Sequence, residues 1–300
     1  MKTATDFRQF EIPNAATFSD TTGGLVKLDI ATPLATAELY IYGAHVTKFQ
    51  PTGQAPVLFL SENSHFVSGK AIRGGVPLIF PWFGPHKTNP ALSAHGFIRT
   101  AEWELESLAQ SASGEVRVTL RFSANDATRA VWPHEFVLRF HVCIGATLEM
   151  TLETENTSSE PFTFEDALHT YFTVADVLEV GVTGLAGVEY LDKVDGGNRK
   201  REGGAPIGVE GVVDRLYLNT QSTCIVDDPS LGRKIVVEKS GSDSTVVWNP
   251  WQGKGMSLAD LGEGWPGMIC IETVNAGENA VTLAPGQKHA TRQSVRIEAR

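Results

Sequence analysis

The chain has 300 residues, of which 42% are hydrophobic and 20% charged, and its formal net charge at pH 7 is −10. This composition is typical of a globular protein with a sizeable core, and the negative charge disfavours a nucleic-acid partner because it repels phosphate backbones. No apolar stretch approaches the roughly 20 residues that a membrane-spanning helix needs, and the mixed, polar N-terminal residues do not resemble a signal peptide.

The three cysteines are Cys143, Cys224 and Cys270, and they form no C-x-x-C pair. An odd, scattered set argues against a disulfide framework and against a structural zinc site. Each cysteine lies in an apolar run, so we expect three small buried hydrophobic side chains. Together with the bulk properties, this predicts a cytoplasmic protein. We also expect a monomer that contacts neither a membrane nor nucleic acid.

Apolar residues that recur at every second position predict β-strands along most of the chain. The clearest alternation covers residues 116–122, 136–142 and 148–152. Further strands are predicted at residues 24–30, 37–41, 47–50, 57–59, 234–238, 245–248 and 268–273, and short helical turns at residues 125–130 and 257–261. Strands with one buried and one wet face are typical of antiparallel sheets.

Many short strands without helices between them predict an all-β fold, a large antiparallel sandwich or barrel with few short helices. The pattern keeps one character throughout, so residues 1–300 are predicted to form a single domain. The segment 192–211, rich in glycine and charge, is the most linker-like piece. Its basic run at residues 198–201 favours a solvated hairpin loop, with a lip over a substrate as the alternative.

Several familiar functional motifs are absent from the sequence. It contains no P-loop, no G-x-G-x-x-G after a strand, no H-E-x-x-H and no G-x-S-x-G, and its eight histidines do not cluster with metal-ligand spacing. These absences argue against most nucleotide-dependent, hydride-transfer and metal-hydrolase activities. We therefore predict a protein that uses neither a metal nor an organic cofactor.

Two segments combine an arginine with flexible glycines. Residues 72–77 read Ile-Arg-Gly-Gly-Val-Pro, and residues 95–99 read His-Gly-Phe-Ile-Arg. Glycine lets backbone and ligand approach closely, and two arginines can hold a phosphate or a row of hydroxyls. Arg73 and Arg99 are therefore candidate anion-binding residues, and His95 lies in the second segment. The alternatives are a structural corner for Arg73 and a surface position for Arg99.

Two titratable side chains stand inside apolar, strand-like sequence. His169 lies within residues 164–172, and Glu272 lies within residues 265–275. Buried carboxylates are uncommon unless paired or functional, and a histidine can exchange a proton near neutral pH. The structural alternatives are a hydrogen-bonded core histidine and an internal salt bridge. Three tryptophans could stack on a sugar or belong to the core: Trp248, Trp251 and Trp265.

Five motifs occur in one order along the chain: Arg-Gly-Gly-Val-Pro from 73, His-Gly-Phe-x-Arg from 95, Ala-Leu-His-Thr-Tyr-Phe from 167, Trp-Asn-Pro-Trp from 248 and Cys-Ile-Glu from 270. In these motifs the chain resembles the glucose-6-phosphate 1-epimerases, or hexose-6-phosphate mutarotases, of the aldose 1-epimerase group. The similarity runs from about Phe18 to about Ser294. It implies a galactose-mutarotase-like β-sandwich, a single catalytic domain, with the sugar in a groove across one sheet.

The resemblance also implies roles for individual residues. The family's catalytic histidine falls on His169 and its catalytic glutamate on Glu272, and its sugar or phosphate contacts fall on Arg73, Arg99, Asp214 and His95. Ala94 stands where some relatives carry a polar residue that touches the substrate. The implied partner is a small sugar phosphate, bound without a metal or cofactor.

The implied reaction interconverts the α and β anomers of a hexose 6-phosphate by ring opening. Glu272 removes the proton from the C1 hydroxyl, and His169, as imidazolium, protonates the ring oxygen. No net redox change is involved, which fits the missing motifs. Three alternatives stay open: an aldose 1-epimerase for an unphosphorylated sugar, a non-catalytic carbohydrate-binding β-sandwich, and a glycoside hydrolase that pairs Glu272 with a second carboxylate such as Asp214.

Overall fold

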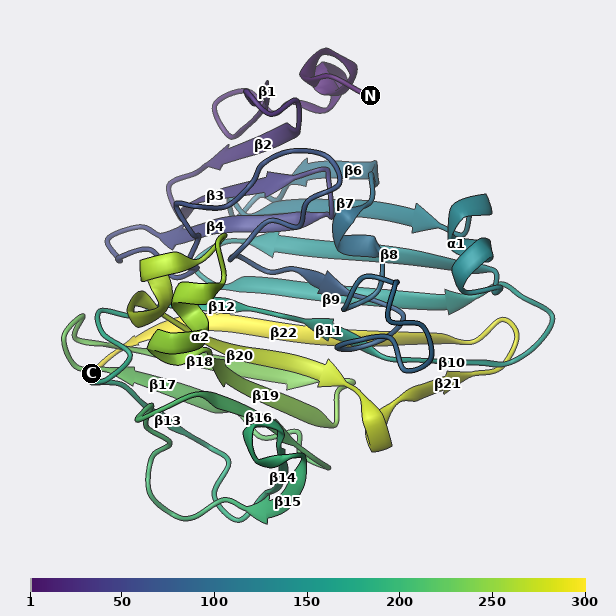
Figure 1. The fold of residues 1–300 in the computed structure, drawn as a ribbon. Helices are drawn as coiled ribbons and strands as arrows, with labels where there is room; N and C mark the ends of the chain where they lie inside the picture. Colours follow the sequence, from purple (N-terminus) through teal and green to yellow (C-terminus); the bar gives the residue numbers. More distant parts are fainter. Residues whose placement is uncertain (1) are drawn as a thin grey trace.

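Two large sheets dominate the computed structural model, which describes residues 2–300 (Figure 1). What we call the front sheet runs, in spatial order, through β15 (Asn198–Arg201), β14 (Glu189–Asp192), β16 (Val213–Tyr217), β19 (Ser244–Asn249), β20 (Met268–Asn275), β11 (Asp166–Leu168) and β5 (Leu78–Ile79). A further short strand, β12 (Tyr171–Thr173), also pairs with β20. The front sheet carries the chemistry described below.

The back sheet has eight strands. In spatial order they are β13 (Gly181–Thr183), β17 (Cys224–Asp228), β18 (Arg233–Ser240), β22 (Lys288–Ala299), β9 (Leu148–Asn156), β8 (Phe136–Ile144), β7 (Val116–Ser123) and β6 (Glu104–Gln110). Every strand pairing in both large sheets is antiparallel. The predicted all-β, antiparallel architecture is therefore confirmed.

Smaller elements complete the structure. Four N-terminal strands form a separate sheet, β1 (Ala16–Asp20), β2 (Val26–Ala31), β3 (Ala35–Tyr40) and β4 (His45–Pro51), and β10 (Phe162–Phe164) pairs with β21 (Val281–Leu283). The helices are all short: α1 (Asp126–Val131), α2 (Trp251–Ser257), and the 3-10 helices η1 (Ala4–Phe10), η2 (Ile98–Thr100), η3 (Lys193–Asp195), η4 (Gly262–Gly267) and η5 (Gly277–Asn279). No helix within residues 2–300 has the length and apolar composition to cross a bilayer.

The two large sheets differ in how their strands are buried. In the back sheet, β8 and β9 alternate strictly between buried and more exposed positions, as expected for strands with one wet face. In the front sheet, all eight residues of β20 are buried. One face of β20 packs on the core between the sheets, and the other is covered by loops and by η4, which contacts β20. The covered outer face of the front sheet is therefore the enclosed place in which a polar site can form.

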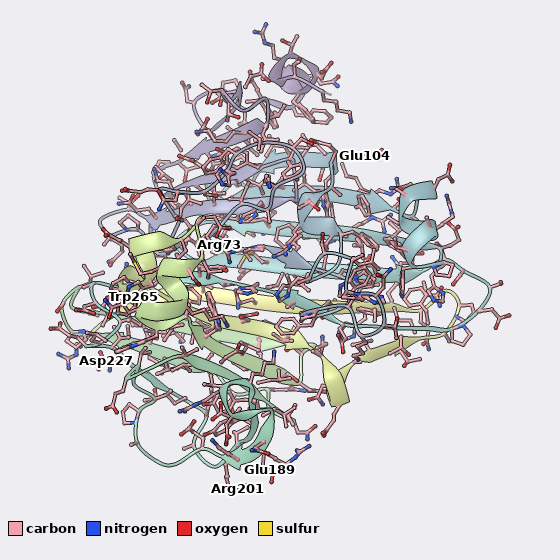
Figure 2. The ribbon with its side chains drawn as sticks, in the orientation of Figure 1. Arg73, Glu104, Glu189, Arg201, Asp227 and Trp265 are labelled. Carbon is pink, nitrogen blue, oxygen red and sulfur yellow. The ribbon has the colours of Figure 1, made fainter. Side chains whose placement is uncertain are left out.

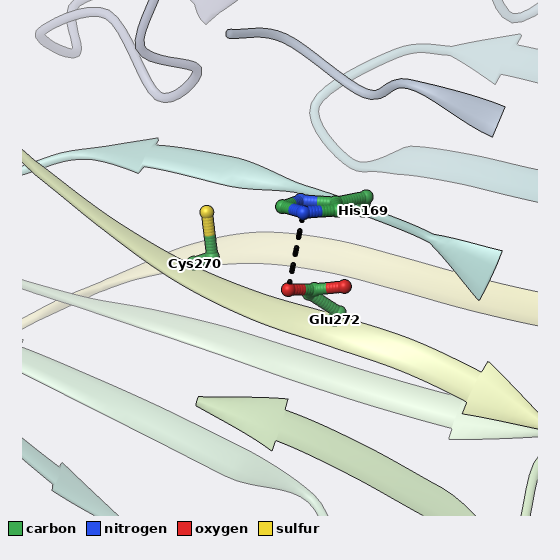
Figure 3. Close-up of side chains that lie close together, drawn as sticks. All are labelled: His169, Cys270 and Glu272. Carbon is green, nitrogen blue, oxygen red and sulfur yellow. Dashed lines mark ion pairs between the residues drawn. The ribbon is translucent and has the colours of Figure 1, made fainter. Parts of the chain in front are cut away.

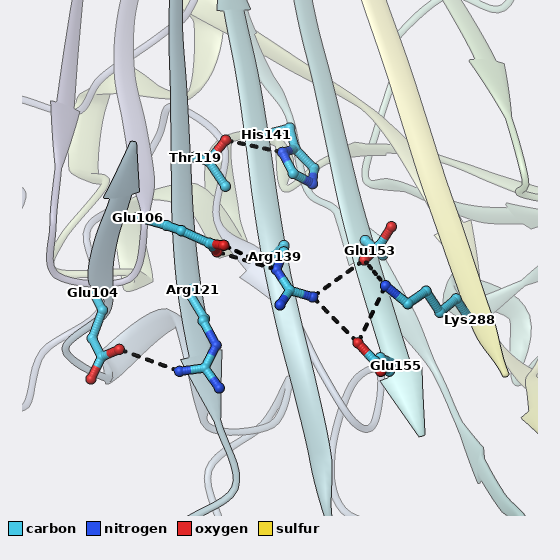
Figure 4. A network of polar contacts seen from close by, with 9 residues as sticks. All are labelled: Glu104, Glu106, Thr119, Arg121, Arg139, His141, Glu153, Glu155 and Lys288. Atoms are coloured by element: carbon cyan, nitrogen blue, oxygen red, sulfur yellow. Dashed lines mark hydrogen bonds and ion pairs between the residues drawn. The ribbon is translucent and has the colours of Figure 1, made fainter. Parts of the chain in front are cut away.

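The outer face of the back sheet carries paired charges rather than a cavity lining. Figure 4 shows Arg139 at the centre of this network, within 3.3 Å of Glu155 and 3.2 Å of Glu106. Lys288 on β22 reaches Glu153 at 3.1 Å. These pairs are partly exposed, so each contributes little stability. Their main effect is to keep this face polar.

Three local predictions need correction or refinement. Residues 57–59 form no strand; the segment makes only isolated bridges, through Leu58 to Phe172 and through Leu60 to Gly74. The short helical turn predicted at 257–261 is present, because the amides of Leu261 and Gly262 both donate to the Leu258 carbonyl oxygen at 2.8 Å, but the helix α2 precedes it at Trp251–Ser257. The basic run 198–201 is the exposed strand β15, which forms a hairpin with β14. Glu189 of β14 and Arg201 of β15 lie at the edge of the molecule (Figure 2).

Candidate active site

His169 and Glu272 face each other across neighbouring strands of the front sheet. β11 pairs with β20 so that Leu168 lies opposite Thr273, and β12 continues along the same partner in the same register. Extending that register across the short break between β11 and β12 places position 169 opposite position 272. The His169 Nε2 atom lies 3.3 Å from Glu272 Oε1 (Figure 3). Strand register thus joins two residues that are far apart in the sequence.

Side-chain alternation along β20 decides which face Glu272 occupies. Its neighbour Ile271 belongs to the core between the sheets, and its other neighbour, Thr273, accepts a hydrogen bond from Gln293 of the back sheet. Successive strand residues point to opposite faces, so Glu272 points outward, away from the core. A carboxylate in this apolar strand therefore does not lie between the sheets.

Burial controls the protonation of the pair. Glu272 is 2% exposed and His169 is 8% exposed. Burial lowers the pKa of His169 well below its ordinary value and raises the pKa of Glu272 well above its own. Removing two charges from water costs more than their mutual attraction returns unless further hydrogen bonds compensate, so the uncharged forms are favoured. His169 Nδ1 and Glu272 Oε2 lack any hydrogen-bond partner among the described residues.

A cavity of about 370 Å³ lies over this pair. Its floor consists of outward-facing side chains on adjacent strands: Asp214 on β16 lies opposite Trp248 on β19, and Val246 on β19 lies opposite Glu272 on β20. The rim is built by residues from several loops and from α2: Arg73, Phe83, Gly84, Pro85, His95, Lys193, Lys254 and Leu258. The cavity volume and its mixed polar and aromatic lining suit a small, hydroxyl-rich ligand.

His95 lies beside His169, with the two ring centroids 5.7 Å apart. Its Nδ1 accepts a hydrogen bond from the Gly84 amide at 3.3 Å. Burial, with a contribution from Arg99, lowers the pKa of His95 to about 3, so this ring is neutral at physiological pH. The chain can turn here because of Gly96, where a Cβ would lie 1.8 Å from the Phe80 carbonyl oxygen.

Asp214 lines the same cavity from the far side of the floor. Its Oδ1 lies 4.0 Å from Lys193 Nζ, and Lys193 itself stands over the Phe83 ring at 4.6 Å. Burial raises the pKa of the Asp214 carboxyl. The lysine comes from η3, which follows the first strand of the β14–β15 hairpin. The segment after residue 192 thus contributes to the rim of the cavity.

Arg73 stands between this cavity and a second one of about 410 Å³. Its Nη1 donates to the Tyr171 hydroxyl at 3.0 Å, and its Nη2 pairs with Asp260 Oδ2 at 3.0 Å. Arg73 and Tyr171 line both cavities, so the two spaces adjoin at these side chains. Figure 2 shows Arg73 beside the α2 and η4 segment.

Most of the charged residues that line the second cavity are cationic. Arg99 lines it together with Lys70, Arg73 and His65, and the carboxylate among its lining residues is Asp260. Arg99 Nη2 donates to the Ala94 carbonyl oxygen at 2.8 Å. Residue 94 therefore holds Arg99 through its main chain, and this contact does not depend on its side chain. Two arginines and a lysine around one cavity match the chemistry of an anion site.

Gln293 of the back sheet connects the segments that carry His169 and Glu272. Its Oε1 accepts a hydrogen bond from the Thr170 hydroxyl at 2.5 Å. Its Nε2 donates to the Thr273 hydroxyl at 2.9 Å and contacts the Ile271 carbonyl oxygen at 3.4 Å. Gln293 is 1% exposed. One buried amide therefore holds residues adjacent to both members of the pair.

The structure brings most of the predicted site residues together. Five of the six line the main cavity, namely Arg73, His95, His169, Asp214 and Glu272; Arg73 also lines the adjoining cavity, as does Arg99. Of the three tryptophans, only Trp248 lines the main cavity; Trp251 and Trp265 pack on each other at 5.2 Å and against the core. Sequence reasoning missed Lys193, Asp260 and Gln293, which have no local pattern that sets them apart.

Comparison with known proteins identifies the family to which the chain belongs. The sequence model of the aldose 1-epimerase family matches residues 27–296. The chain belongs to this family, whose members are isomerases that interconvert sugar anomers.

Individual relatives narrow the comparison. A protein of Escherichia coli K12 that carries the provisional name glucose-6-phosphate 1-epimerase is 36% identical over 272 residues, 89% of each chain. A protein of Cenchrus ciliaris with the same provisional name is 35% identical over 261 residues, 84% of this chain and 78% of that protein.

Solved structures agree in fold. A provisionally named mutarotase, YeaD, from Salmonella typhimurium superposes with a TM-score of 0.90 at 30% identity, covering 97% of this chain and 96% of that one. Galactose 1-epimerase from Lactobacillus acidophilus NCFM superposes with a TM-score of 0.69 at 14% identity, covering 95% and 98%. The galactose-mutarotase-like β-sandwich expected from the sequence is confirmed.

Proposed function

We propose that this protein interconverts the α and β anomers of a hexose 6-phosphate, with Glu272 and His169 transferring the protons. One observation carries the proposal: an imidazole and a carboxylate 3.3 Å apart, each with an unpartnered polar atom, border a cavity of sugar size. The relatives named for glucose 6-phosphate support the substrate class.

Ring opening needs one group to remove the proton from the C1 hydroxyl while another protonates the ring oxygen. Glu272 is the base and His169 the acid in this direction. After the C1–C2 bond rotates, the ring closes with the roles reversed. Positioned proton transfer of this kind contributes about 10²- to 10⁴-fold to the rate.

The pair carries one proton in both halves of this cycle. Before ring opening the proton resides on His169, and afterwards the pair consists of neutral imidazole and carboxylic acid. Burial favours the second distribution. The charged distribution is costly because neither His169 Nδ1 nor Glu272 Oε2 has a hydrogen-bond partner among the described residues.

The second cavity supplies a place for the phosphate. Arg73 and Arg99 line it, and it adjoins the main cavity at Arg73 and Tyr171. A sugar over the pair can therefore extend its phosphate toward two guanidinium groups. The Asp260 carboxylate pairs with the Arg73 guanidinium at 3.0 Å, so a bound phosphate competes with this carboxylate for Arg73.

The first test removes each member of the pair. Glu272→Gln and His169→Ala should slow enzyme-catalysed anomer exchange by about 10²- to 10⁴-fold, because each removes one proton-transfer group. Exchange is measured by NMR between the anomeric signals of glucose 6-phosphate. Glu149→Gln on the exposed face of the back sheet is the matched control. A near-normal rate in either pair variant contradicts the assignment, and sugar binding without any exchange in the native protein supports a carbohydrate-binding module instead.

The second test addresses the phosphate. Exchange of glucose 6-phosphate should be much faster than that of glucose at equal concentration, and Arg99→Ala should reduce this preference by raising KM for the phosphorylated sugar. Arg129→Ala, at a partly exposed position in α1, is the control. Equal exchange of both sugars identifies an aldose 1-epimerase for unphosphorylated substrates.

A further inference from the structure

One buried nucleophilic group beside the pair has no part in the proton transfers. Cys270 lies two residues before Glu272 on β20, so both side chains point to the same outer face. The residue is 0% exposed and packs with Tyr171 and Met268. A thiol so close to a histidine and a carboxylate changes what this site can bind.

The three side chains present their donor atoms to one another. One ligand atom from each of His169, Cys270 and Glu272 lies within 4.8 Å of the other two (Figure 3). Ligands around a tetrahedral Zn²⁺ bind at about 2.0–2.3 Å, which sets them roughly 3.3–3.8 Å apart. The His169–Glu272 separation of 3.3 Å already meets this spacing. The sulfur needs to approach the other two donor atoms by about 1.5 Å at most.

We propose that His169, Cys270 and Glu272 bind a thiophilic divalent cation of the Zn²⁺ type, and that this cation inhibits the enzyme. The cation takes a lone pair of the His169 imidazole and one of a Glu272 oxygen, and so occupies the two groups that exchange protons with the sugar. The metal-bound state and the catalytic state therefore exclude each other. A water molecule or a sugar hydroxyl in the adjoining cavity supplies the fourth ligand.

The chemistry of the donors selects the cation. Neutral imidazole binds without losing a proton, whereas the Cys270 thiol and the Glu272 carboxylic acid each release one, so about two protons leave per cation bound. Because metal binding releases these protons, affinity increases with pH. Mg²⁺ and Ca²⁺ require more oxygen ligands than this site offers.

The surrounding charges make the thiol important for cation binding. Arg73 and Lys193 line the same cavity and oppose a cation there. Asp214 offsets part of the Lys193 charge, but without Cys270 only a neutral imidazole and one carboxylate hold the cation directly. The thiolate adds a second negative charge and a soft donor, for which Zn²⁺ has a marked preference.

A spectroscopic titration tests the proposal without relying on activity. Co²⁺ replaces Zn²⁺ as probe, and the wild-type protein should develop the near-ultraviolet charge-transfer absorption of a cobalt–thiolate bond. Cys270→Ala should lose this absorption and weaken Co²⁺ binding by roughly 100-fold or more, since even residues behind the ligands affect affinity about 10- to 100-fold. Cys224→Ala, at the other fully buried cysteine, is the matched control and should keep both.

Two further measurements complete the test. Zn²⁺ should suppress anomer exchange in the wild type and in Cys224→Ala, a chelator should restore it, and Mg²⁺ should have no effect. If Cys270→Ala does not fold, proton release from the wild-type protein in weak buffer, about two per Co²⁺ bound, provides the readout. Absence of the charge-transfer band in wild type, or its persistence in Cys270→Ala, overturns the proposal. Failure of the proposed enzymatic function leaves the cobalt result unaffected.

Discussion

At the scale of single residues, the site depends on titratable groups placed where water is nearly absent. The same burial acts in opposite directions on its two members, lowering the pKa of His169 and raising that of Glu272. Both shifts favour a pair that holds one proton in total. A pair of this kind is ready for a reaction that moves a proton in at one oxygen and out at another.

This predicts a broad pH optimum. A second proton should bind only well below pH 6.5, since the pKa of His169 is depressed, and the single proton should leave only well above pH 4.5, since that of Glu272 is raised. The rate constant kcat should therefore show no break near pH 6.5. It is measured at saturating substrate, because the phosphate of the sugar itself titrates near pH 6. A break at the pKa of a free histidine contradicts the burial argument.

At the scale of elements, the site is a property of strand pairing. The break between β11 and β12 keeps one register on β20, so His169 meets Glu272 without any loop having to close. Gln293 on the longest strand, β22, supports both neighbours from behind. The back sheet contributes to the site although none of its strands borders the pair.

Replacing this support should affect turnover more than stability alone explains. Gln293→Leu leaves the Thr170 and Thr273 hydroxyls unpaired in the core, and should cost about 2–5 kcal/mol of unfolding free energy and lower kcat with little change in KM. Thr291→Val is the control. Thr291 lies on the same strand as Gln293, and the substitution removes a buried hydrogen bond of 2.7 Å from its hydroxyl to Asp166. Equal loss of kcat in both variants at equal stability indicates a purely structural role.

At the scale of the whole molecule, neutral histidines are built into the packing. His45, on β4 of the N-terminal sheet, is 1% exposed and its Nε2 contacts the Gly74 carbonyl oxygen at 2.7 Å. Burial lowers its pKa to about 4, against an ordinary value of 6.5. This contact connects the N-terminal sheet to the glycine next to Arg73. Packing far from the pair thereby helps to hold the loop that carries Arg73.

Acid should therefore destabilise the protein through His45. The unfolded chain takes up this proton as pH falls below 6.5 while the folded protein does not until about pH 4, so stability is present above 6.5 and is lost on acidification. The loss from this residue between pH 7 and pH 5 is about 2 kcal/mol. Urea unfolding at both pH values measures it, and His45→Gln, which retains a donor, should show a smaller loss. Parallel pH dependence in the two proteins refutes the assignment.

Local pattern was enough to predict part of this structure. Alternation identified β7, β8 and β9, because a sheet with one wet face imprints period two on its sequence. The short helix α1 was also predicted, and its cap Asn125 accepts from the Thr128 amide. The segment 57–59 was assigned wrongly as a strand, because a short apolar run has no period of its own.

The candidate site was predicted only in part, for a related reason. His169, Glu272 and the two arginines lie in distinctive motifs. Lys193, Asp260 and Gln293 lie in segments whose composition is unremarkable, and they matter because of what faces them. No local pattern reveals a partner that lies on another strand.

The sequence by itself determined the all-β class and the antiparallel pairing, since these follow from alternation, whereas the proposed proton-transfer roles of His169 and Glu272 rest on the family motifs. Only the tertiary structure decided that position 169 faces 272, that a thiol stands beside both, and that Arg73 is shared between two cavities and already paired with Asp260. The physical reason is strand register. A shift of one residue along β20 would turn every side chain of the shifted strand to the opposite face, and packing against the second sheet selects the register that buries the apolar side chains.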